Sequence, residues 1–195
     1  MKSIEDIKAL IQRDYNNKLK KFMVMEPCDY VLVGDSMVAY FKPSLPWCMQ
    51  GIAGDTTIGL LNRIHAIKHV HPKRVIIHIG TNDLVLTNLT LDETVNNMKN
   101  MKKQLDQVEV LFCTPIPVDE NMMSEHNRLR TNASLMVLRK MMIETFDKQN
   151  IIDMHPLFDQ EGLPKTLHIG DGLHLNKKGY HVYEQVLTPY MSGDI

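Results

Sequence analysis

The sequence predicts an α/β fold in which a parallel β-sheet is covered by helices on both faces. Short apolar segments alternate along the chain with longer segments whose apolar residues recur at helical spacing. The connections between the apolar segments lack the short turns of β-hairpins, so the strands are expected to run parallel. With 195 residues and 44% hydrophobic residues, the chain can bury a substantial core. We therefore predict a single domain over residues 1–195.

The first part of the chain predicts two helices and two strands. Residues 4–23 form an amphipathic helix, because Ile, Leu, Tyr and Phe recur there at roughly helical spacing. An apolar strand follows at residues 29–35, and residues 47–53 form a second strand that ends in a glycine turn. Residues 55–57, Asp-Thr-Thr, offer N-caps for the next helix, which continues to Pro72 without a predicted break.

The rest of the chain repeats the alternation of strands and helices. Thr90 and Glu93 form a capping box, which predicts the start of a helix with an apolar stripe. Asn176 is expected to begin the final helix. The predicted elements are, in order, a strand at 74–79, a helix from 90 to about 105, a strand at 108–113, a long helix within about 122–148, a strand at 150–153 and a helix from 176.

Residues suited to acyl transfer follow the first three predicted strands. The first strand runs through Val31-Leu-Val into Gly-Asp-Ser36, which places a serine hydroxyl at the turn after the strand. Gly54 follows the second strand and Asn82 follows the third. Ligands of parallel α/β sheets bind beyond the carboxyl ends of the strands, so we expect these residues to lie at one edge.

A serine hydroxyl is a poor nucleophile until a base accepts its proton, and the chain has nine histidines. His174 is the favoured base, because Asp171 lies three residues before it and can orient its ring. Asp153 and His155, after the fifth strand, are the second choice. The other histidines are interpreted as residues without a catalytic role. We expect His78 in the core, His69 and His71 at a helix C-terminus, and His65, His126, His168 and His181 facing solvent or a pocket rim.

Acyl transfer also needs donors for the oxyanion that forms at the carbonyl group. The candidates are the backbone N–H groups of Ser36 and Gly54 and the side-chain amide of Asn82. Carboxylates beside an oxyanion would repel it. Asp35 and Asp83 are therefore interpreted as turn and network residues that accept hydrogen bonds from neighbouring backbone N–H groups.

The overall composition excludes several other classes of protein. The formal net charge of -1 gives no global field for nucleic acid or anionic lipid. The three cysteines are far apart, which favours reduced thiols, and no Cys/His spacing indicates a metal site. No apolar run approaches the roughly 20 residues of a membrane helix. We expect a cytoplasmic protein without integral membrane association, and leave a homo-oligomer open.

Four ordered motifs resemble the SGNH, or GDSL-type, hydrolase family, and in particular its platelet-activating-factor acetylhydrolase-like branch. The motifs are Gly34-Asp-Ser36, Gly51-Ile-Ala-Gly54-Asp-Thr, Gly80-Thr-Asn82-Asp and Asp171-Gly-Leu-His174-Leu-Asn. The resemblance implies a three-layer α/β/α sandwich with a five-stranded, flavodoxin-like parallel sheet. It also implies Ser36 as nucleophile, His174 as base, Asp171 as its orienting acid, Gly54 and Asn82 as oxyanion donors, and no metal or organic cofactor.

The motifs and the resemblance together predict a serine-dependent carboxylic ester hydrolase that works through an acyl-enzyme. Short-chain or O-acetyl esters of sugars or small alcohols are the expected substrates. A thioesterase or lysophospholipase for longer acyl chains is the alternative, with residues 84–89 and 115–123 as an apolar lid. A non-catalytic binding module of the same fold is the third interpretation. No substrate-binding residue can be assigned from the sequence.

Overall fold

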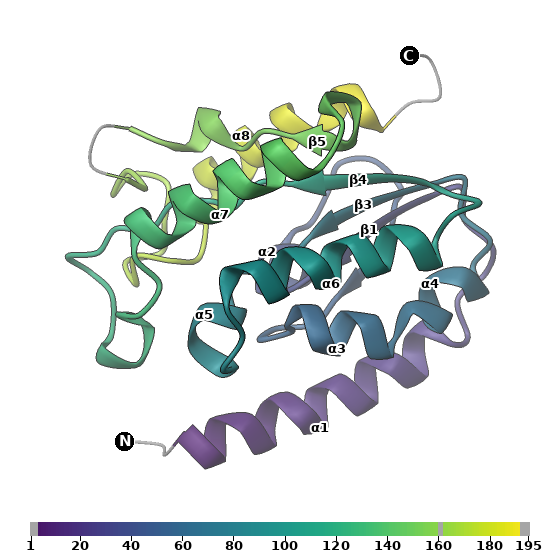
Figure 1. Cartoon of the computed structure of the whole chain (residues 1–195), viewed down its shortest axis with the longest axis horizontal. Helices are drawn as coiled ribbons and strands as arrows, with labels where there is room; N and C mark the ends of the chain where they lie inside the picture. Colours follow the sequence, from purple (N-terminus) through teal and green to yellow (C-terminus); the bar gives the residue numbers. More distant parts are fainter. Residues whose placement is uncertain (1–3, 160–161, 192–195) are drawn as a thin grey trace. The chain divides into compact units, whose positions relative to one another are not determined.

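A computed structural model describes residues 4–159 and 162–191, and for residues 4–11 it describes the backbone alone. The chain divides into two compact units, unit 1 from Met1 to Val110 and unit 2 from Leu111 to Ile195. Figure 1 shows the elements of both units. The single domain over residues 1–195 stays a prediction.

Five short strands form a parallel sheet, as predicted. The strand order is β2-β1-β3-β4-β5, which is the flavodoxin-like order. β1 pairs in parallel with both β2 and β3, and β4 pairs in parallel with β5. All but the first residue of β1, β3 and β4 are buried, which explains their continuous apolar sequences. The strands are β1 (Tyr30–Gly34), β2 (Cys48–Gly51), β3 (Arg74–His78), β4 (Glu109–Cys113) and β5 (Ile151–Ile152).

The helices of unit 1 follow the sequence pattern closely where local signals are strong. The capping box of Thr90 and Glu93 is present at the start of α6, and Val95, Met98 and Met101 face the core as predicted. Two short helices, α2 and α5, were not expected from the sequence. The helices are α1 (Ile4–Phe22), α2 (Ser36–Tyr40), α3 (Thr57–Asn62), α4 (Ile64–His69), α5 (Asp83–Leu86) and α6 (Leu91–Gln104).

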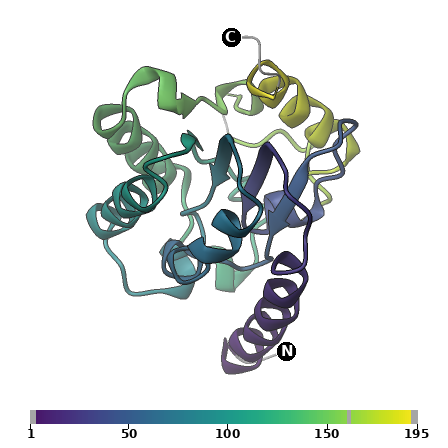
Figure 2. The same cartoon turned by 90° about the vertical axis from the view of Figure 1, so that its right-hand side faces the viewer.

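The amphipathic helix predicted at residues 4–23 is present as α1. Its C-terminal part packs on the rest of unit 1. Phe22 is buried there with Ile52 and Ala66, and the partly buried Tyr15 and Leu19 pack against this cluster. The apolar residues predicted on its first turns lie outside the described side chains. Figures 1 and 2 both show α1 at the outer side of unit 1.

The cysteine prediction is wrong for two of the three residues. Cys28 and Cys48 form a disulfide, because β1 and β2 are neighbouring strands and both cysteines lie near their amino ends. Cys113 is a buried free thiol in β4, as expected. Strand pairing brought together residues that are 20 positions apart, and their spacing in the sequence gave no sign of it.

In unit 2 the helix predicted within residues 122–148 is shorter than expected. It begins as α7 at Asn132, where the Thr131 side chain accepts the backbone N–H of Ser134 as an N-cap. Asn132 also uses its side chain to bond both the N–H and the C=O of Val118, which fixes the preceding segment in a non-helical path. The final helix starts as predicted, with Asn176 as its N-cap. The elements are α7 (Asn132–Thr145), α8 (Lys177–Leu187) and the 3₁₀ turns η1 (Glu125–Asn127), η2 (Lys148–Asn150), η3 (His155–Leu157) and η4 (Thr188–Tyr190).

Among the described residues, no helix combines the length and the apolar composition that crossing a membrane would require.

Candidate active site

Ser36 lies at the point where β1 ends and α2 begins. Asp35 caps α2, because one oxygen of its carboxylate accepts the backbone N–H of Met37 at 2.9 Å. Packing before the turn is close, since a Cβ atom at Gly34 would collide with the carbonyl oxygen of His78. Ser36 is 8% exposed. Asp35 therefore has the turn role predicted for it, and Ser36 is the first residue of a helix.

The turns that follow β1, β2 and β3 are joined by hydrogen bonds. Asn82 Nδ2 donates to the carbonyl oxygen of Asp55 at 2.9 Å. Asp55 is the residue after Gly54, in the turn that follows β2. Gly54 has a φ of 76°, in the left-handed region that glycine tolerates. The Thr81 hydroxyl lies 3.4 Å from Asp35 Oδ2, beside the serine turn. Within unit 1, the structure thus links the turns that carry the three predicted oxyanion donors.

Asp83 is a network residue, as predicted. It is 1% exposed, and its two oxygens accept the backbone N–H of Thr57 at 3.2 and 3.0 Å. The Thr57 hydroxyl donates to the same carboxylate and accepts from Asn97 Nδ2 at 2.9 Å. Burial raises the pKa of Asp83 to about 6, although the bonds from Thr57 act against this rise. Asp83 ties the turn after β3 to the start of α3.

Arg63 is a fully buried cation that sequence reasoning missed. Its Nε donates to Asp55 Oδ2 at 2.8 Å, and its Nη2 donates to the carbonyl oxygens of Gly34 at 3.2 Å and Gln50 at 3.0 Å. These bonds explain why the helix predicted after residue 57 is broken at Arg63 into α3 and α4. Arg63 holds the ends of β1 and β2 and the turn after Gly54. The only signal in the sequence was a lone charge among apolar residues.

In unit 2, the side chains of Asp171 and His174 are in contact, as their spacing predicted, and their acid–base role stays a prediction. His174 Nδ1 lies 2.6 Å from Asp171 Oδ2. Asp171 Oδ1 accepts the backbone N–H groups of Leu173 and His174 at 3.0 and 2.9 Å. Burial acts to raise the pKa of Asp171, but the hydrogen bonds from His174 and the backbone outweigh it, so the pKa lies below its usual value. An ionised Asp171 makes Nδ1 of His174 the protonated nitrogen and leaves Nε2 as the basic atom.

The second-choice pair, Asp153 and His155, is not organised for acid–base chemistry. The Asp153 carboxylate accepts the guanidinium of Arg139 and the hydroxyl of Thr114. His155 is exposed and donates its backbone N–H to Asp153 at 3.2 Å. The charge of Asp153 is therefore compensated by Arg139, which argues against this pair as the acid–base unit.

Two further histidines are buried, and one of them corrects a prediction. His78 is a core residue of β3, as expected, and burial lowers its pKa to about 4. His168 was expected to face solvent or a pocket rim, but it is 5% exposed and faces Asp119. It lies in the segment that carries Asp171, and nothing in its sequence context indicated that packing.

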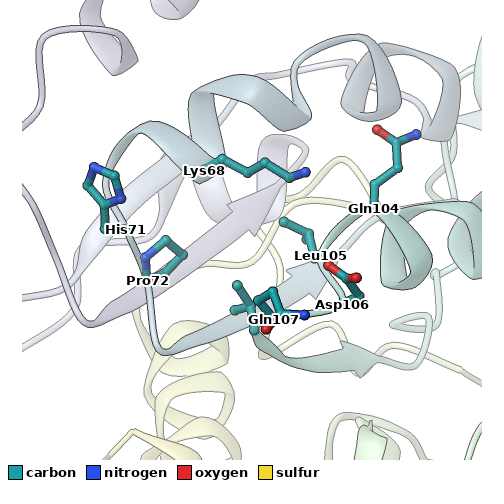
Figure 3. A pocket seen from close by; sticks show the side chains of 8 residues that line it. Lys68, His71, Pro72, Gln104, Leu105, Asp106 and Gln107 are labelled. Atoms are coloured by element: carbon teal, nitrogen blue, oxygen red, sulfur yellow. The ribbon is translucent and has the colours of Figure 1, made fainter.

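A surface hollow of about 330 Å³ in unit 1 is lined by none of these residues. Its lining comes from the segments that precede β3 and β4, whereas the predicted site residues follow strands. Figure 3 shows Lys68 extending from α4 along this hollow, with His71 and Pro72 on one side and Gln104 to Gln107 on the other. It contains none of the predicted catalytic residues, and the chemistry is expected elsewhere.

The structure is an α/β fold with a five-stranded parallel sheet, and the predicted site residues of unit 1 follow its strands. The chain belongs to the GDSL-like lipase/acylhydrolase family, whose model matches residues 32–182. This match covers all four motifs and makes the chain a hydrolase enzyme by family. A search of curated proteins gave no match.

Solved structures share the fold at low sequence identity. A proposed platelet activating factor from Streptococcus pneumoniae is 22% identical, with a TM-score of 0.81 over 97% of this chain and 98% of that one. A GDSL-like lipase from Bacteroides thetaiotaomicron is 17% identical, with a TM-score of 0.76 over 91% and 96%. A lipase/acylhydrolase from Enterococcus faecalis is 22% identical, with a TM-score of 0.70 over 88% and 100%.

Proposed function

We propose that this hydrolase cleaves carboxylic esters through a serine acyl-enzyme. Ser36 is the nucleophile, His174 the general base and acid, and Asp171 the residue that orients His174. The backbone N–H groups of Ser36 and Gly54 and the amide of Asn82 bind the oxyanion. The observation that carries the proposal is the 2.6 Å contact between His174 Nδ1 and Asp171 Oδ2, because a carboxylate that orients Nδ1 supports Nε2 of His174 as the base.

The proposed reaction has two halves. Ser36 Oγ attacks the ester carbonyl while His174 Nε2 takes the hydroxyl proton, and the carbonyl oxygen becomes an oxyanion. His174 then gives the proton to the departing alkoxide, which leaves as the alcohol and yields the acyl-enzyme. In the second half, His174 takes a proton from water, the resulting hydroxide attacks the acyl carbonyl, and the Ser36 oxygen recovers its proton as the acid departs.

The hydrogen bonds of unit 1 support the assignment of the oxyanion donors. The bond from Asn82 Nδ2 to the carbonyl oxygen of Asp55 holds the side-chain amide in place, and we assign this amide to the oxyanion. An amide donates without becoming a competing base. Arg63 holds Asp55 and the carbonyl oxygen of Gly34, and so fixes both the Gly54 turn and the serine turn. Donors held in place before the reaction stabilise developing charge most effectively.

For the substrate we propose short-chain or O-acetyl esters of sugars or small alcohols. The branch resemblance of the motifs supports this choice. For the alternative of longer acyl chains, residues 84–89 and 115–123 were expected as an apolar lid, but residues 115–119 are buried. Val118 and Asp119 donate their backbone N–H groups to Asn132 and Gly172, at 2.9 Å each. A segment held in this way is poorly suited to move as a lid.

Labelling with an organophosphorus ester tests the residue assignments directly. Such a reagent phosphorylates a serine only when a base activates its hydroxyl. The expected result is one adduct on Ser36, found by peptide mass spectrometry, and loss of labelling in both Ser36→Ala and His174→Ala. Ser134→Ala, in the first turn of α7, serves as the control that keeps the label. Labelling of another serine, or undiminished ester hydrolysis by Ser36→Ala, would overturn the proposal.

The acyl preference is measured with nitrophenyl esters. We expect kcat/KM for nitrophenyl acetate to exceed the value for nitrophenyl octanoate. The reverse order would favour the thioesterase or lysophospholipase alternative while leaving the roles of Ser36 and His174 intact.

The disulfide between Cys28 and Cys48 bears on the location of the enzyme. Disulfides persist in oxidising compartments and are rare in the cytosol, so this bond counts against the cytoplasmic location expected from the sequence. Alkylation of thiols at the moment of cell lysis, followed by mass spectrometry, measures whether the two cysteines are bonded in the cell.

A further inference from the structure

A second histidine–aspartate pair lies beside the proposed base in unit 2. His168 Nε2 is 3.4 Å from Asp119 Oδ2, and the two side chains are 2% and 7% exposed. His168 forms an isolated bridge with Leu175, and the backbone N–H of Ile169 donates to the carbonyl oxygen of His174. Residues 168–175 are thus a small closed loop, with His168 at its base and Asp171 at its tip.

The hydrogen bonds of His168 define its protonation. The backbone N–H groups of Gly170 and Gly172 both donate to Nδ1, at 3.0 and 3.2 Å. A nitrogen that accepts two N–H groups carries no proton, so the ring is neutral with its proton on Nε2, toward Asp119. His174 has the opposite tautomer, because its Nδ1 faces the carboxylate of Asp171.

The two N–H groups that His168 accepts flank Asp171 on both sides. Gly170 and Gly172 have φ values of 101° and 72°, in the region that disfavours other residues. The loop is also held from outside, because the Asp119 N–H donates to the carbonyl oxygen of Gly172 at 2.9 Å. A Cβ atom at position 172 would lie 2.5 Å from the carbonyl oxygen of Asp119. His168 therefore fixes the peptide groups on either side of the catalytic carboxylate.

We propose that His168, whose Nε2 faces the Asp119 carboxylate at 3.4 Å without forming a hydrogen bond, is a positioning residue for the acid–base pair. This inference rests on the proposed function, since it assigns to His168 the task of holding Asp171 at the distance that orients His174. A displacement of about 1 Å in a catalytic group can lower a rate about a hundredfold. His168 itself is not the base, because its Nδ1 is occupied by two N–H groups and its Nε2 carries a proton.

Two substitutions separate the two halves of the His168 ring. In His168→Asn the amide oxygen takes the place of Nδ1 and can accept the N–H groups of Gly170 and Gly172. In His168→Gln the side chain reaches the place of Nε2 and Asp119 but offers no acceptor at the Nδ1 position. We expect His168→Gln to lower kcat by about tenfold to a hundredfold at little-changed KM. His168→Asn should retain most of kcat, and His181→Gln, on the exposed part of α8, is the control.

The comparison of the two variants decides the inference. Circular dichroism and urea unfolding establish that each variant is folded before kcat is compared. A purely structural role would change the folded fraction without distinguishing Asn from Gln per folded molecule. Equal kcat for all folded variants, or a larger loss in His168→Asn than in His168→Gln, would overturn the positioning role.

A measurement on the native protein stands even where a variant fails to fold. In ¹⁵N NMR of imidazole-labelled enzyme near neutral pH, His168 should carry its proton on Nε2 and His174 on Nδ1. A protonated Nδ1 of His168 refutes the inference. This experiment does not require ester turnover, so it tests the inference separately from the proposed function. Unimpaired hydrolysis by Ser36→Ala would refute the proposed function but would not change the expected tautomers.

Discussion

Replacing the buried carboxyl of Asp83 with an amide should change how the stability of the protein depends on pH. Asp83 is 1% exposed, and its pKa is raised by burial from 3.8 to about 6. A carboxyl whose pKa is higher in the folded state binds its proton more tightly after folding. Its contribution to stability is therefore complete below about pH 4 and is lost as the pH rises through about 6.

The magnitude follows from the size of the shift. A shift of about two pH units at roughly 1.4 kcal/mol per unit corresponds to about 3 kcal/mol. The free energy of unfolding of the native protein, relative to that of Asp83→Asn, should fall by most of this amount, about 2 kcal/mol, between pH 4 and pH 7. The Thr57 hydroxyl accepts a hydrogen bond from Asn97 and donates its own proton to the side chain at position 83. In Asp83→Asn, the amide oxygen can still accept this proton.

Urea unfolding of both proteins, followed by circular dichroism from pH 4 to pH 8, measures this difference. Subtracting the unfolding free energy of Asp83→Asn from that of the native protein cancels the titration of the groups that both proteins share. Asp106→Asn, which replaces an exposed carboxyl of unit 1, is the matched control. The control should give a difference that is nearly independent of pH. A flat difference for Asp83→Asn as well, or one that grows with pH, would refute the assignment of a raised pKa to this carboxyl.

Three other perturbations of unit 1 have defined outcomes. Asn82→Ala should lower kcat about a hundredfold to a thousandfold in steady-state ester hydrolysis, as for one oxyanion donor, and a normal kcat would contradict its role. Arg63→Met should destabilise unit 1 by about 3–5 kcal/mol in urea unfolding, because Asp55 is left buried without its cation. If this is the cause, the double variant Arg63→Met/Asp55→Asn should lose less stability than Arg63→Met. An equal loss in the two variants would contradict it. Reducing the Cys28–Cys48 disulfide with dithiothreitol should lower the free energy of unfolding by about 3 kcal/mol, given its sequence separation of 20, and Cys28→Ser/Cys48→Ser should be insensitive to the reductant.

The features that the sequence predicted correctly are those determined within a few residues. The capping box of Thr90 and Glu93 and the N-cap of Asn176 both join groups three residues apart or fewer, so their residue types suffice. The pair of Asp171 and His174 is equally local. Strands are recognisable because burial on both faces demands continuous apolar sequence.

The features that the sequence did not predict depend on partners far along the chain. Arg63 breaks a helix to reach the carbonyl oxygens of Gly34 and Gln50, which only the sheet brings near it. Cys28 meets Cys48 because β1 and β2 are neighbours in the sheet. In both cases, local spacing favoured the simpler interpretation, and long-range packing decided the structure.

Hydrogen-bond direction and burial separate the candidates for the base where spacing alone could not. Burial lowers the pKa of His78 to about 4, which makes it a weak base at neutral pH. The carboxylate near His155 is occupied by Arg139. His168 also has a carboxylate within reach, but two backbone N–H groups fill its Nδ1, so its proton lies on Nε2. Among these four histidines, His174 alone combines an orienting carboxylate on Nδ1 with a basic Nε2. The ring nitrogen that faces the carboxylate therefore distinguishes the proposed catalytic pair, Asp171 and His174, from the proposed positioning residue His168.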